Sequence, residues 1–158
     1  RDEQHGAHYE LTCAEVAELA SERIRPGATK AGARLQVEIS NDRSLPGRRA
    51  NLAGLVLRNL LQNAVEASPP AGIVRLTGGA TADGGAEFLI EDRGRGLAET
   101  VRVRLFQPCA STKQGGSGLG LALSQNLAQQ AGGRIDLVRS TADGTCFRLV
   151  LGPNAESA

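Results

Sequence analysis

The order of hydrophobic and polar residues predicts a helix near the start of the chain. Thr12 and Glu15 have the spacing of a capping box, in which each side chain bonds the backbone N–H of the other residue. The pair Pro26-Gly27 is typical of a helix end. Between these signals, hydrophobic residues recur at helical spacing. They are Val16, Leu19, Ala20 and Ile24, which we expect to face the core.

A second, longer helix is expected from about residue 50 to residue 68, because two prolines follow. At about 100° per residue, one set of hydrophobic residues should form its core face. They are Ala53, Leu57, Leu60, Leu61 and Ala64. Asn59, Asn63 and Glu66 form a polar stripe beside that face. Two amides and a carboxylate in line could hold a hydrated Mg²⁺ ion, although a solvated helix face has the same pattern.

Alternating hydrophobic residues predict strands in the rest of the chain. They are expected at 34–39, 73–77, 87–91, 134–139 and 146–151. The sequence Thr-Ala-Asp-Gly occurs at 81–84 and again at 141–144, and it predicts a turn at each place. Helices combined with mostly hairpin-linked strands indicate an α/β (α+β) two-layer sandwich, with helices on one face of one sheet.

The composition excludes several classes of function. The chain has 158 residues, of which 41% are hydrophobic and 22% charged, and a net charge of +1, as expected of a globular domain. Long basic runs are missing and aromatic residues are only 3%, so we expect no nucleic-acid partner. No hydrophobic run approaches the roughly 18 residues that span a bilayer, so we expect no direct membrane contact. Cys13, Cys109 and Cys146 fit neither a disulfide framework nor a metal site, which favours a cytoplasmic setting.

Two glycine-containing motifs could carry chemistry. Glycines 115, 116, 118 and 120 lie directly before the last expected helix, where backbone N–H groups can bind an anion or simply allow close packing. The segment is neither a Walker A loop nor a dinucleotide fingerprint, because the flanking residues differ. The other motif is Asp92 with Gly94 and Gly96, at the end of an apolar strand. It could bind an exocyclic amine and admit a flat ring, or form a simple turn.

Five short motifs occur in a characteristic order along the chain. They are NLLQNAVEA, EDRGRGL, LFQP, GGSGLGLAL and GTCF. Together they resemble the ATP-binding catalytic domain of sensor histidine kinases, in the GHKL ATPase superfamily. The resemblance implies a mixed, mainly antiparallel sheet with ATP between the sheet, the NLLQNAVEA helix and a lid. We therefore expect residues 9–152 to be this domain, 1–8 a leader or linker remnant, and 153–158 a disordered tail.

The resemblance also implies roles for single residues. Asn63 would coordinate Mg²⁺ between the phosphates, and Asn59 would support the phosphates or the metal as a catalytic residue. Asp92 would bind the adenine amine, and Thr145 would reach adenine through a water. Gly94 and Gly96 would shape the adenine slot. Residues expected along the phosphates are Lys113, Gly116, Gly118, Leu119 and Gly120, with Lys113 also catalytic; Phe106 would anchor the base of the lid.

The implied reaction transfers the γ-phosphoryl group of Mg-ATP to a histidine in a dimerisation domain, with a response regulator as a further partner. His5 and His8 lack the sequence context of such an acceptor, so we expect this chain to bind ATP and ADP without phosphorylating itself. The resemblance implies a cytoplasmic location and leaves open whether the parent protein is anchored in the inner membrane. Two departures stand out: Glu66 replaces a common basic residue, and Cys109 replaces an aromatic residue of the lid.

Three alternatives remain open at this point. Hydrolysing members of the superfamily place a glutamate at the position of Asn59, where it activates water, and an amide cannot accept that proton. Serine kinases that act on anti-sigma partners are close relatives. A nucleotide-binding module with degenerate catalysis is the third possibility. The Ser-Thr-Lys sequence that precedes the glycines resembles nitrogen-regulation and dicarboxylate-sensing kinases.

Overall fold

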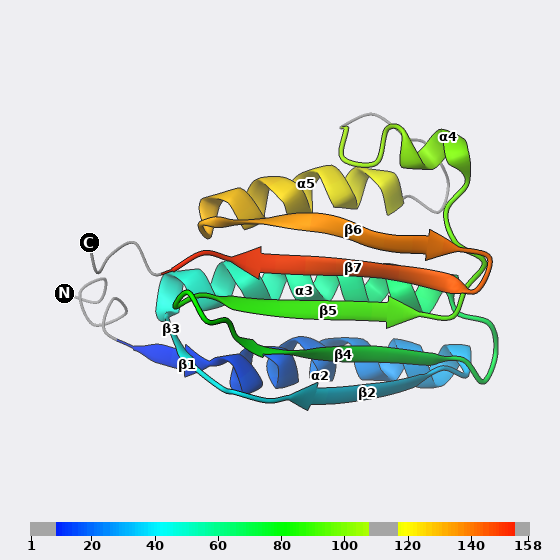
Figure 1. Cartoon of the computed structure of the whole chain (residues 1–158). Helices are drawn as coiled ribbons and strands as arrows, with labels where there is room; N and C mark the ends of the chain where they lie inside the picture. Colours follow the sequence, from blue (N-terminus) through cyan, green and yellow to red (C-terminus); the bar gives the residue numbers. More distant parts are fainter. Residues whose placement is uncertain (1–8, 108–116, 154–158) are drawn as a thin grey trace.

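The computed structural model describes residues 9–107 and 117–153, and for residues 117–120 it describes the backbone only. The strands are β1 (Glu10–Thr12), β2 (Arg34–Ile39), β3 (Ser44–Pro46), β4 (Ile73–Ala80), β5 (Ala86–Asp92), β6 (Gly133–Thr141) and β7 (Gly144–Leu151). The helices are α2 (Cys13–Ala31), α3 (Gly47–Ala67), α4 (Glu99–Arg102) and α5 (Ser117–Gln130). Figure 1 shows the three long helices lying along the main sheet, with α3 between α2 and α5. The predicted α/β two-layer sandwich is confirmed.

The main sheet has the strand order β2-β4-β5-β7-β6. Only β2 and β4 pair in parallel, and the other neighbours are antiparallel. The sheet is therefore mixed and mainly antiparallel, as expected. The short strands β1 and β3 pair separately, which joins the start of α2 to the start of α3.

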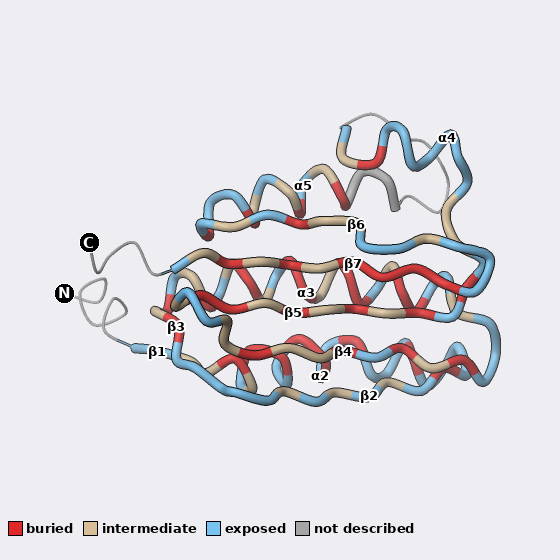
Figure 2. The backbone as a smooth tube through the Cα atoms, in the orientation of Figure 1, coloured by how far each residue is buried: buried red, intermediate tan, exposed pale blue. Residues whose placement is uncertain are grey.

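The core lies between the helices and one face of the sheet (Figure 2). All five residues of the predicted α3 core face are buried, with exposed fractions from 0% to 3%. On β5 the buried residues alternate, so that Phe88 and Ile90 face the helices while Glu87 and Leu89 face outward. This alternation is the period of two that a strand requires, and it places Asp92 on the inner face.

The start of α2 agrees with the sequence and its end does not. Thr12 and Glu15 form both hydrogen bonds of the capping box, at 3.1 and 2.8 Å. The helix continues past Pro26 to Ala31, and Gly32 caps it in the left-handed conformation. Pro26 lies on the exposed side, whereas Ala28 is 2% exposed and packs into the core. Burial of the next turn therefore outweighs the hydrogen bond that the proline removes.

Other local expectations need correction. Leu19, expected in the core, is 52% exposed on α2. The helix α3 begins at Gly47, three residues before the expected start, and its first residue follows β3 directly. A short helix, α4, lies between β5 and α5, where the sequence patterns predict no helix. Cys13 and Cys146 are free and buried, and burial raises the pKa of both thiols. In the described part of the chain, no helix combines the length and hydrophobicity that a membrane span requires.

Candidate functional site

A cavity of about 310 Å³ lies between α3, α5 and the inner face of the sheet. Its walls are mostly apolar and include Leu60 of α3, Leu121 of α5 and Phe147 of β7. Four polar side chains also line it: Asn63, Glu66, Asp92 and Thr145. An apolar cavity with a few convergent polar groups is the usual form of a small-molecule site. Residues from separate parts of the chain thus meet at this one place.

Asp92 provides the buried carboxyl group of the cavity. It is the last residue of β5 and is 7% exposed. Its Oδ1 accepts a 2.8 Å hydrogen bond from the backbone N–H of Gly94. Burial raises the pKa of this carboxyl group, although the N–H groups of Gly94 and Thr145 and the charge of Arg139 act in the opposite direction. The result is a carboxyl group held in place and only partly hydrated.

Thr145 lies beside Asp92 because the two residues are paired in the register of β5 and β7. It is 4% exposed, and its hydroxyl lies 3.5 Å from the hydroxyl of Ser140 on β6. Ser140 in turn accepts a hydrogen bond of 2.8 Å from the backbone N–H of Leu97, which lines the cavity. A hydroxyl and a carboxyl group are therefore held side by side at the end of the sheet.

The structure gives a steric reason for Gly94 and Gly96. A Cβ atom on Gly94 would collide with the carbonyl oxygen of Ala67, in the last turn of α3. Gly96 has a φ of +84°, and a Cβ atom there would collide with the carbonyl oxygen of Thr141. The two glycines let the segment after β5 pass between α3 and β6. Gly96 also lines the cavity, so the same residue allows the close approach to β6 and forms part of the cavity wall.

The polar stripe of α3 divides between two environments. Asn63 and Glu66 line the cavity, and Glu66 accepts a 3.0 Å hydrogen bond from Gln62. Asn59 lies one helical turn before Asn63 and outside the cavity lining. Its Nδ2 donates a 2.8 Å hydrogen bond to Oγ of Ser124 on α5. The sequence pointed to neither Ser124 nor its pairing with Asn59, because helix periodicity does not reveal which helices pack together.

The glycine-rich segment is only partly described. Gly118, Leu119 and Gly120 lie within the first turn of α5, which starts at Ser117, so these glycines do not precede the helix as expected. Lys113, Gly116 and Cys109 lie outside the described residues. Phe106 is half-buried and packs against the core. The N-terminal end of α5 is at the cavity, since Leu121 lines it.

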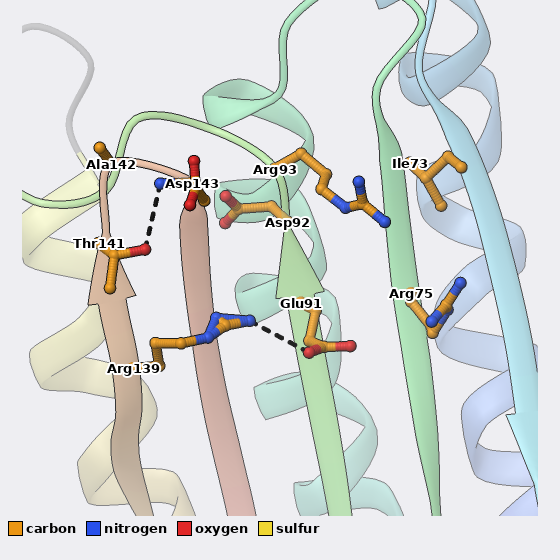
Figure 3. A pocket seen from close by; sticks show the side chains of 9 residues that line it. All are labelled: Ile73, Arg75, Glu91, Asp92, Arg93, Arg139, Thr141, Ala142 and Asp143. Atoms are coloured by element: carbon orange, nitrogen blue, oxygen red, sulfur yellow. Dashed lines mark hydrogen bonds and ion pairs between the residues drawn. The ribbon is translucent and has the colours of Figure 1, made fainter.

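A larger cavity, of about 790 Å³, lies near the same end of the sheet (Figure 3). Its walls are largely charged and include Arg75, Arg93 and the ion pair between Arg139 and Glu91, whose atoms are 3.2 Å apart. Arg75 and Glu91 are outward residues of their strands, so this cavity opens on the face that carries no helix. It includes neither α3 nor α5 residues. The smaller cavity is therefore the better candidate, because it alone combines both helices with Asp92.

The polar side chains at the cavity suit a metal ion whose ligands come mainly from a bound substrate. Among residues 9–107 and 117–153, no three His, Cys, Asp or Glu side chains cluster as a metal cage would require. Mg²⁺ prefers oxygen ligands, keeps several waters and commonly takes only one or two protein groups beside phosphates. Asn63, which lines the cavity and carries an amide oxygen, fits that requirement.

Comparison with known proteins agrees with this geometry. Residues 49–155 match the family described as histidine kinase-, DNA gyrase B-, and HSP90-like ATPase. The sensor histidine kinase ZraS of Klebsiella oxytoca is 36% identical over 101 residues, which are 64% of this chain and 22% of that protein. The C4-dicarboxylate transport sensor protein DctB of Rhizobium meliloti is 41% identical over 98 residues, 61% of this chain and 16% of DctB. This chain is therefore similar to a limited part of each relative.

A solved structure supports the same assignment over most of the chain. The mycobacterial sensor histidine kinase MprB superposes with a TM-score of 0.75 at 28% identity, covering 92% of this chain and 97% of the MprB chain. The family match covers α3 except its first two residues, the strands β4 to β7 and the cavity that they surround. The chain therefore belongs to the histidine kinase-, DNA gyrase B- and HSP90-like ATPase family and contains an ATP-binding domain of the histidine kinase type.

Proposed function

We propose that this chain is the part of a sensor histidine kinase that binds Mg-ATP and presents its γ-phosphoryl group to a histidine of a dimerisation domain. The observation that carries the proposal is the meeting of Asn63, Asp92, Gly96 and Thr145 around one cavity. The phosphorylated histidine would then pass its phosphoryl group to a response regulator. Residues 9–152 would form the domain, and it would act in the cytoplasm, whether or not the parent protein is anchored in the inner membrane.

The Asp92 end of the cavity suits adenine. A carboxylate accepts hydrogen bonds only, so it can select an exocyclic amine over a carbonyl group. Oδ1 of Asp92 already accepts the N–H of Gly94, which directs us to Oδ2 as the acceptor for the adenine amine. The hydroxyl of Thr145 would bind adenine through a water, and Gly94 and Gly96 would flank the ring. The apolar walls would cover its faces.

The α5 end of the cavity suits the phosphates. Backbone N–H groups in the first turn of a helix are free to bind an anion, and Gly118, Leu119 and Gly120 occupy that turn of α5. Asn63 would hold Mg²⁺, which neutralises phosphate charge when it is bound. Lys113 and Gly116 would complete the phosphate site from the preceding segment. Asn59 would support the phosphates or the metal from α3.

The positions of the carboxyl groups favour transfer over hydrolysis. Asn59 cannot accept a proton from water, so it cannot act as the general base that hydrolysing relatives use. The α3 carboxylate at the cavity is Glu66, which is exposed and hydrogen-bonded to Gln62. Transfer to a histidine needs positioning and charge neutralisation more than a base on this chain. If the chain instead hydrolyses ATP, the Glu66→Gln variant should remove that activity.

Two measurements test the proposal. Calorimetric titration with ATP and ADP, each with and without Mg²⁺, should show micromolar binding that Mg²⁺ strengthens for ATP. Adding a separately prepared dimerisation domain of a sensor histidine kinase should then give a phosphohistidine that is lost in acid. If the chain binds nucleotide but the full-length parent protein transfers no phosphoryl group to its own histidine, a nucleotide-binding module with degenerate catalysis is favoured. Absence of nucleotide binding would contradict the proposal.

A further inference from the structure

The Asn59–Ser124 hydrogen bond is a polar contact between two helices inside the apolar layer. Ser124 is 0% exposed, and its Oγ lies 2.8 Å from Nδ2 of Asn59. The helices α3 and α5 pack against each other along this region, and each carries part of the proposed nucleotide site. A buried hydroxyl that meets an amide across a helix interface restricts both side chains, since an unmade hydrogen bond there is costly.

The position of this bond relates it to both parts of the site. Residues four apart share one face of a helix, so Asn59 lies one turn from Asn63 on α3, and Ser124 lies one turn from Gly120 on α5. Asn63 lines the cavity, and Gly120 belongs to the first turn of α5. The bond is thus one turn away from the proposed metal ligand and one turn away from the proposed phosphate-binding turn.

We propose that Ser124 is a positioning residue for Mg-ATP, which acts by fixing the side-chain amide of Asn59. The inference rests on the proposed function and adds a residue to it. Donation from Nδ2 to Ser124 holds the amide nitrogen at the helix interface. The amide oxygen Oδ1 is then directed away from Ser124, and it is an acceptor suited to the water shell of Mg²⁺. Without the hydroxyl, the side-chain amide of Asn59 can rotate. Nδ2 can then take the orientation in which Oδ1 would accept a hydrogen bond from the water shell of Mg²⁺.

The same bond ties α5 to α3 close to the cavity. A second tie, at the far end of the two helices, runs from Nε of Arg49 to the carbonyl oxygen of Ala131 at 2.7 Å. The two helices are therefore antiparallel: the Asn59–Ser124 bond joins them near their middles, and Arg49 joins the start of α3 to the residue that follows α5. Loss of the Ser124 hydroxyl would remove only the contact that lies one turn from the cavity and would leave the Arg49 contact in place, so its effect should appear in phosphate and Mg²⁺ binding more than in overall stability.

The test is a double-mutant cycle on the intact chain, read out by calorimetry. The Ser124→Ala variant should bind Mg-ATP about fivefold more weakly, the effect of one hydrogen bond. Its affinity for ADP without Mg²⁺ should change less than about twofold, because the proposed effect acts through the water shell of Mg²⁺, which is absent from that titration. In the Asn59→Ala background, the Ser124→Ala change should have no further effect on Mg-ATP. These results together would support the inference.

Ser21→Ala is the matched control. Ser21 is also 0% exposed on a helix of the same layer, but its hydroxyl donates only to the carbonyl oxygen of Ala17, at 2.8 Å. This variant should lose stability without losing the Mg²⁺ effect. Two results would overturn the role of Ser124 and leave the proposed function standing. One is an equal loss of affinity for Mg-ATP and for ADP without Mg²⁺ in Ser124→Ala, and the other is an undiminished loss in the Asn59→Ala background. A wild-type chain that binds no adenine nucleotide would overturn the proposed function as well.

Discussion

The carboxylate of Asp92 accepts a 2.8 Å hydrogen bond at Oδ1 from the backbone N–H of Gly94, two residues later. The Asp-x-Gly sequence was compatible with a turn or with a ligand-binding carboxylate, and the structure shows the turn together with a carboxylate that lines a cavity. The turn fixes the side chain at the end of β5, where it lines the cavity. Local backbone geometry thereby orients the group that we expect to select adenine.

Replacing Asp92 with Asn should weaken ATP binding by about 1.5–3 kcal/mol, the scale of a hydrogen bond to a charged group. The amide can still accept the N–H of Gly94 through its oxygen, so the turn should persist. Its NH₂ group would then face the adenine amine, donor against donor. Isothermal titration calorimetry measures the loss. Glu91→Gln is the matched control, because Glu91 is the preceding acidic residue of β5 but pairs with Arg139 on the opposite face. Equal losses in both variants would show a general charge effect.

ATP binding and stability should depend on pH in opposite directions through Asp92. Burial raises the pKa of this carboxyl group above its ordinary value, so the folded chain holds the proton more tightly than the unfolded chain. As pH falls through the raised pKa, ATP affinity should fall because the adenine amine loses its ionised acceptor. Over the same range, the free energy of unfolding of the wild type should rise relative to Asp92→Asn.

The comparison with Asp92→Asn at each pH removes the titration of other groups and of the nucleotide. Calorimetry gives the affinities, and urea denaturation gives the free energies of unfolding. A difference between the two variants that stays constant from neutral pH into the acid range would contradict the raised pKa.

Gly94→Ala should destabilise the fold by about 1–3 kcal/mol, the usual cost of an overpacked core. The added Cβ would meet the carbonyl oxygen of Ala67 and would lie 3.1 Å from Oδ1 of Asp92. Gly27→Ala is the control, because Gly27 lies in α2 with nothing within 4 Å of an added Cβ. It should stabilise the chain by about 0.5–1 kcal/mol. Thermal or urea unfolding measures both. Stabilisation by both substitutions would disprove the proposed close approach.

Arg49→Ala should lower the free energy of unfolding by about 1.5–3 kcal/mol, because it removes hydrogen bonds of a charged donor. Arg49 donates from Nε to Ala131 and from Nη2 to Gly152, both at 2.7 Å. Arg49→Lys should restore little, since an ammonium group lacks the fork that reaches two carbonyl groups. The exposed neighbour Arg48, changed to Ala, is the control in urea denaturation. Full recovery in Arg49→Lys would contradict this geometry.

Much of the fold followed from local sequence patterns. The core face of α3, the capping box at Thr12 and the main strands depend on side-chain spacing within one element, which the sequence contains directly. The short strands β1 and β3 were not predicted, because a segment of three residues is too short to show alternation of hydrophobic and polar residues. The predicted end of α2 was wrong, because Pro26 is a local signal, whereas the burial of Ala28 depends on packing.

The candidate site divides in the same way. The sequence by itself determined which residues we expect to carry the chemistry: the motifs contain Asn63, Asp92 and Thr145, and the structure brings these three to one cavity. Only the tertiary structure decided which residues from distant parts of the chain meet, such as Asn59 with Ser124, 65 residues apart, or Arg49 with Gly152, 103 residues apart. The physical reason is that periodicity indicates which face of an element is buried, whereas the partner of that face depends on how the helices and sheet pack together.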